Sequence, residues 1–96
     1  MKLPYLILAT TLSLSSYAMA CEKPPSPNLP DPGTAVTAQM VKAKNDMKAY
    51  IKAADAYLAC VESDTARYNS MVDEMQAAAE GFNSIVRKYK KRMSAS

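Results

Sequence analysis

The sequence CEKPPSPNLPDPGT, residues 21–34, decides how this chain folds. It starts with a cysteine, places Pro24, Pro27 and Pro30 at every third position, and ends in the Asp-Pro-Gly-Thr turn of residues 31–34. Because proline fixes φ and restricts the residue before it, we expect an extended polyproline arm. A polyproline helix has three residues per turn, so the three prolines would line one face of the arm.

Helical spacing follows the turn. From Ala35 onward, apolar residues recur at alternating intervals of four and three, and no proline interrupts them. This pattern predicts one helix over about 35–62 and a second helix over about 65–92. Asp31 or Thr34 would cap the first helix, because both residue types accept hydrogen bonds from the first free backbone N–H groups.

A short polar run, Glu62-Ser63-Asp64-Thr65, separates the two helical patterns. Ser63 or Asp64 would cap the second helix, and so short a connection predicts an antiparallel hairpin. Because no glycine or proline forces a turn there, one long helix that dimerises as a coiled coil is the alternative. A buried Asp64 would be unfavourable in a continuous helical seam, which favours the hairpin.

The arm and the first helix have matching lengths. Thirteen arm steps at 3.1 Å span ~40 Å, and twenty-five helical steps to Cys60 at 1.5 Å span ~38 Å. An arm that runs back along the first helix therefore brings Cys21 level with Cys60, and we predict a disulfide between them. The same lengths place Tyr50 and Tyr57 between the prolines of the arm. We expect these rings to stack on Pro24, Pro27 and Pro30 and to keep their hydroxyls at the surface.

The first twenty residues are typical of a signal peptide. Lys2 gives a positive start, an apolar run follows, and Ala18-Met19-Ala20 forms an A-x-A cleavage site before Cys21. The apolar run is too short to span a bilayer, which needs ~20 apolar residues. We predict a signal peptide over 1–20, the proline-rich arm over 21–34 and the helical hairpin over 35–96. The protein would be periplasmic or secreted, with acylation of Cys21 as a lipoprotein the less favoured alternative.

Four stretches of the chain form a recognisable set: CEKPPSPNLPD (21–31), AYI (49–51), YLAC (57–60) and YNSMVDEM (68–75). Together they resemble a family of small exported proteins from Gram-negative bacteria. The resemblance covers most of the chain after residue 20. It implies a periplasmic compartment and a helical hairpin, and it implies no activity.

The composition argues against catalysis. The chain has no His and no Trp, and its two glycines cannot form a Gly-rich phosphate loop. Both cysteines are assigned to the predicted disulfide, so neither serves as a nucleophile or a metal ligand. We therefore predict that the protein is not an enzyme, and we expect no catalytic, cofactor-binding or metal-binding residues and no cofactor.

The strongest charge feature lies near the end of the chain, where five of six consecutive residues are basic: Arg87, Lys88, Lys90, Lys91 and Arg92. Cations near a helix C-terminus complement the helix dipole and keep the protein soluble. The same cluster could contact anionic lipid, lipopolysaccharide or peptidoglycan. Nucleic acid is not expected as a partner outside the cytoplasm.

These features predict a non-enzymatic periplasmic or secreted protein that binds another envelope protein or itself. Its framework would be an all-α antiparallel hairpin with the arm packed on the first helix. The alternative is a protein that binds an anionic envelope surface through the basic end of the second helix.

Overall fold

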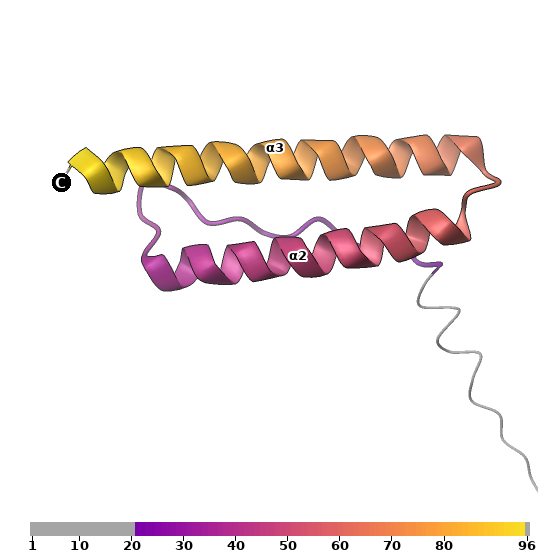
Figure 1. Cartoon of the computed structure of the whole chain (residues 1–96), viewed down its shortest axis with the longest axis horizontal. Coiled ribbons are helices and arrows are strands. Elements are labelled where there is room, and N and C mark those ends of the chain that lie inside the picture. Colours follow the sequence, from indigo (N-terminus) through magenta and orange to yellow (C-terminus); the bar gives the residue numbers. More distant parts are fainter. Residues whose placement is uncertain (1–20, 96) are drawn as a thin grey trace, which may run out of the picture.

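The structure is a computed structural model that describes residues 21–95, so the predicted signal peptide lies outside the described residues. Helix α2 spans Thr37–Cys60 and helix α3 spans Thr65–Ala95. The two helices run antiparallel along most of their length (Figure 1). The predicted all-α hairpin is therefore confirmed, and the alternative of one long helix is wrong.

The chain reverses direction between Val61 and Asp64. The Val61 N–H donates to the carbonyl of Tyr57 at 3.0 Å, which closes the last turn of α2. The Asp64 carboxylate accepts the backbone N–H of Arg67 at 3.2 Å, the bond expected of a helix N-cap. Asp64, one of the two predicted caps, thus occupies the position that starts α3.

The predicted cap of the first helix is wrong. The Asp31 carboxylate accepts the N–H of Gly33 at 2.8 Å, and the Asp31 carbonyl accepts the N–H of Ala35 at 2.9 Å. Asp31 therefore holds an isolated turn before the helix, and the Thr34 N–H donates to the same carbonyl. An Asp side chain that bonds two residues ahead in a turn is no longer available to a helix start.

Helix α2 begins two residues later than predicted because Val36 is extended, with φ −102° and ψ 166°. The side-chain oxygen of Gln39 accepts the Val36 N–H at 2.9 Å, which supplies one half of a capping box. Both predicted C-termini also shift: α2 ends at Cys60 before residue 62, and α3 continues to Ala95 beyond residue 92.

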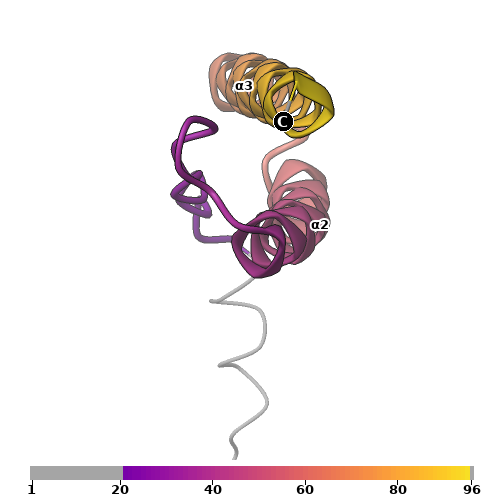
Figure 2. The same ribbon diagram turned by 90° about the vertical axis from the view of Figure 1, so that its left-hand side faces the viewer.

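The arm is covalently attached to the far end of α2. Cys21 and Cys60 form the predicted disulfide, with their Cα atoms 5.3 Å apart, inside the usual range for such bridges. Residues 23–31 form neither helix nor strand. They run back along the hairpin to the turn that precedes α2, and Figure 2 shows them on one side of the plane through α2 and α3.

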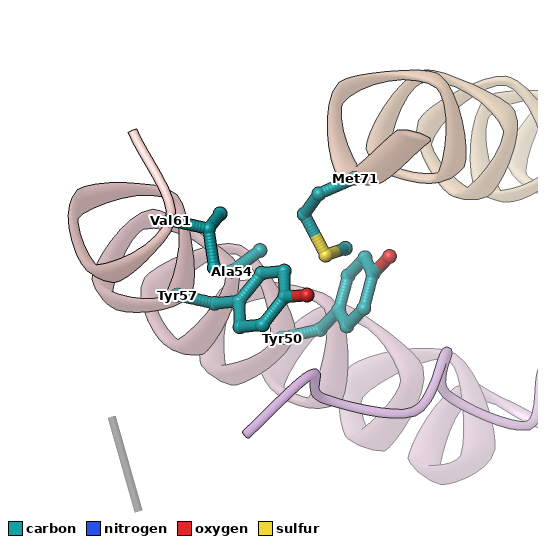
Figure 3. Close-up of a cluster of buried hydrophobic side chains, with 5 residues drawn as sticks. All are labelled: Tyr50, Ala54, Tyr57, Val61 and Met71. Carbon is teal, nitrogen blue, oxygen red and sulfur yellow. The ribbon is translucent and has the colours of Figure 1, made fainter. Parts of the chain in front are cut away.

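The core lies near the closed end of the hairpin (Figure 3). Tyr50, Ala54 and Tyr57 of α2, together with Val61 directly after it, cluster with Met71 of α3, whose side chain is fully buried. The four positions before α3 recur at intervals of four and three, so they share one face. Ile51, Leu58, Met75 and Ala78 pack around this cluster and remain partly exposed.

Candidate interaction surfaces

The arm-covered side contains the residues predicted for arm–helix packing. Pro24, Pro27 and Pro30 are each half-buried, whereas Pro25 and Ser26 between them are exposed. Figure 3 shows the arm passing beside Tyr50. The three-residue spacing of the prolines thus coincides with the pattern of burial along the arm.

Both predicted tyrosines are buried. Tyr50 is 4% exposed and Tyr57 is 6% exposed. The expectation that the hydroxyls lie at the surface is wrong for Tyr50, whose phenol oxygen is buried and has no hydrogen-bond partner among residues 21–95. The ring of Tyr50 points toward Met71 of α3 and is part of the core cluster (Figure 3).

The arm also contacts α3, which the sequence did not predict. Lys23 forms an ion pair with Glu74 of α3, and this hydrogen-bonded carboxylate raises the pKa of Lys23 above 10.5. A Cβ added to Gly81 would lie 3.9 Å from the Leu29 side chain. A methyl group at residue 81 would therefore fit at an ordinary contact distance, whereas a larger side chain would meet the arm.

Arg92 joins the end of α3 to the turn before α2. Its guanidinium donates to the carbonyl of Pro32 at 2.8 Å and to the carbonyl of Ala35. One turn earlier, the hydroxyls of Tyr89 and Thr37 share a 2.8 Å hydrogen bond. The Arg92 guanidinium also lies 5.4 Å from the centre of the Tyr89 ring. This corner is thus held by polar contacts.

These contacts divide the predicted anion-binding residues into two groups. Arg92 is half-buried and satisfied by backbone carbonyls, so it serves the fold. The other four are exposed and form no ion pair within residues 21–95: Arg87, Lys88, Lys90 and Lys91. Lys91 lies three residues from Lys88 and four from Arg87, which places these three side chains on the outward side of α3, whereas Lys90 lines the space between the two helices.

The side of the hairpin opposite the arm is open. A shallow apolar groove of about 230 Å³ lies between the two helices near the open end of the hairpin. Met40 and Val41 of α2 and Phe82 and Val86 of α3 form its walls, and no arm residue lines it. Lys44 and Lys90 also line the groove, one from each helix. We call this side of the hairpin the open face.

Apolar side chains continue along the open face toward the closed end. Tyr68 is 37% exposed, and Val41 at the other end is 52% exposed. Tyr68 and Val86 are eighteen residues apart, which is five helical turns, so both lie on the same side of α3. The open face thus presents an aromatic side chain at the closed end and an apolar groove at the open end.

Residues 21–95 contain no group of three or more His, Cys, Asp or Glu side chains that could hold a metal ion. Neither α2 nor α3 has a stretch that is long and apolar enough to cross a membrane. Comparisons of the chain with protein-family models, with curated proteins and with solved structures found no match.

Proposed function

We propose that this protein is a non-enzymatic interaction protein of the cell envelope, a disulfide-stapled hairpin that binds another envelope protein or itself. The open face is the observation that supports the proposal most. The arm covers one side of the hairpin, whereas the other side leaves an apolar groove and an exposed tyrosine in water. Exposed apolar surface rimmed by polar side chains is typical of protein interaction sites.

An exported location follows from the same proposal. The Cys21–Cys60 bridge is a structural disulfide, and such bridges persist in oxidising compartments such as the periplasm. The bridge also uses the Cys21 sulfur that a lipoprotein would need for acylation, which favours ordinary cleavage of a signal peptide over lipidation. The resemblance to a family of exported Gram-negative proteins agrees with this location.

Site-specific photocrosslinking in the native host tests the interaction. A photoreactive amino acid at Phe82, inside the groove, should give protein adducts after illumination. The same amino acid at Lys88, on the outward side of α3, is the matched control and should give few adducts. Equal yields from the two positions, or no adduct from Phe82, would contradict the proposal.

The second candidate is binding to an anionic envelope surface through Arg87, Lys88, Lys90 and Lys91. The observation in its favour is that these four exposed cations lack acidic partners within residues 21–95. Each cation near an anionic surface adds up to ~1 kcal/mol of attraction, so the cluster is strong enough for reversible binding.

Vesicle binding tests this second candidate. The chain should bind vesicles that contain phosphatidylglycerol, bind those of phosphatidylcholine alone weakly, and lose the binding in high salt. Lys88→Glu with Lys91→Glu should weaken binding more than tenfold. Lys48→Glu with Lys52→Glu changes the net charge equally on α2, and a matching loss there would show that the α3 cluster is not the site.

A further inference from the structure

The charges of the hairpin are separated along its length. The open-end half, residues 25–51 and 81–95, contains eight basic and two acidic side chains. The closed-end half, residues 21–24 and 52–80, contains three basic and seven acidic side chains. Each half therefore attracts the opposite half of a second copy, and repels the same half.

The open face has a protruding aromatic side chain at one end and an apolar groove that could receive such a side chain at the other. Tyr68 stands exposed in the acidic half, and the apolar groove around Val86 lies in the basic half. Asp55 and Lys44 are eleven residues apart on α2, which is about three helical turns, so they share one edge of that helix. Lys44 lines the groove, and Asp55 lies on the same edge in the acidic half.

A single two-fold axis between two copies would bring Tyr68 of each copy opposite Val86 of the other, and Lys44 opposite Asp55. The midpoint of Tyr68 and Val86 is Ala77, and the midpoint of Lys44 and Asp55 lies just before Tyr50. The Thr37–Tyr89 hydrogen bond shows which residues of α2 and α3 lie at the same level. Both midpoints are about twelve residues, or ~18 Å, from that level, so a single axis perpendicular to the helices passes through both.

We propose that two copies of this chain pair antiparallel through their open faces, with Tyr68 of each copy in the groove of the other. The inference deepens the proposed function by naming a second copy as the partner. Asp55 of each copy then faces Lys44 of the other, and the apolar face between them leaves water. A parallel pairing would place eight basic residues against eight, so the charges select the antiparallel arrangement.

Charge reversal tests the pairing in the full chain, expressed for export and purified with its disulfide intact. Sedimentation equilibrium should show a monomer–dimer equilibrium. Lys44→Glu and Asp55→Lys should each weaken the dimer at least tenfold. The two-fold axis repeats the contact between residues 44 and 55, so each single variant places like charges opposite each other at two positions. The double variant restores both pairs with reversed polarity and should recover the affinity of the native chain to within threefold.

Lys88→Glu has the same charge change as Lys44→Glu on the outward side of α3, and it should leave the dimer constant unchanged. Tyr68→Ser should abolish dimerisation, and its unchanged circular dichroism would show that the monomer is still folded. A chain that stays monomeric at all concentrations overturns the inference. So does a double variant that fails to recover.

A photoreactive amino acid at Tyr68 provides an independent test. Residue 68 is ~27 Å from residue 86 along its own helix, so a crosslink between these segments joins two molecules. Mass spectrometry should map the crosslink to residues 82–90. A monomeric chain that still forms adducts with another protein through Phe82 would refute the pairing and leave the proposed function standing. Loss of both kinds of adduct would refute both.

Discussion

The two sides of the hairpin differ in how their surfaces are covered. On the arm side, the chain covers its own helices through the Cys21–Cys60 bridge, the Lys23–Glu74 ion pair and the Arg92 hydrogen bonds. On the open face, the groove and Tyr68 have no such cover within residues 21–95. Two helices alone cannot enclose a core, and here the arm covers one side of the hairpin while the other side stays open.

The largest loss of stability is expected from removing the Cys21–Cys60 disulfide on the arm side. Cys21→Ser with Cys60→Ser opens a loop of about forty residues, which should lower the free energy of unfolding by ~4 kcal/mol in the chain-entropy model. Urea denaturation followed by circular dichroism, at a concentration where the chain is monomeric, measures the loss. Reduced native protein should match the double variant. An unchanged midpoint would mean that the arm is held by its other contacts.

Substitution of Arg92 should cause the next largest loss of stability. Arg92→Gln removes a charged donor from two backbone carbonyls that lie partly buried, which should cost ~2 kcal/mol of unfolding free energy. Lys91→Gln removes an exposed cation from the next residue and should cost less than ~0.5 kcal/mol. Chemical denaturation of both variants checks the difference. Equal losses would show that Arg92 acts only through its charge at the end of α3.

Gly81 tests how closely the arm approaches α3. Gly81→Ala should raise the free energy of unfolding by up to ~1 kcal/mol, because an added methyl meets Leu29 at an ordinary contact distance and alanine favours helix. Gly81→Leu should instead cost 1–3 kcal/mol by displacing the arm, a rough range for overpacking. Ala79→Leu places the same side chain toward the open face and should cost less. If the two leucine variants are equally stable, the arm does not restrict residue 81.

The smallest loss of stability is expected at Lys23, whose side chain is exposed. Lys23→Met removes the ion pair with Glu74 and should slightly destabilise the folded chain at neutral pH. The pKa of Lys23 is raised above 10.5 in the folded state. Its contribution is therefore complete below pH 10.5 and is lost as the pH rises through the folded-state pKa. The stability difference between native and variant should disappear at that alkaline end. A difference that persists there would mean that packing of the Lys23 stem, and not its charge, is responsible.

The main architecture was predictable from the sequence because it depends on periodicity and length. Alternating intervals of four and three indicate both helices, and nearly equal lengths of the arm and the first helix bring Cys21 level with Cys60. The start of α2 was mispredicted because a turn and a helix start both use an Asp carboxylate. Nothing in the order of residues shows that Asp31 would bond Gly33 instead.

The candidate surfaces were only partly predictable. The basic cluster near the end of α3 is visible in the sequence as a run of charge, but the position of Arg92 against the turn at Pro32 depends on how the hairpin closes. The contacts of the arm with α3 were missed for the same reason. The one signal was Gly81, a residue that weakens a helix and that lies beside Leu29 of the arm.

The disulfide also has a topological consequence. Residues 21–60 form a covalent ring that contains the arm and all of α2, whereas α3 is joined to that ring only through the turn at 61–64. Only non-covalent contacts otherwise hold α3 to the ring, so loss of those contacts would free α3 while the ring stays closed. Native-state hydrogen exchange should divide the amides of the two helices into separate opening units, with α3 exchanging at the lower free energy.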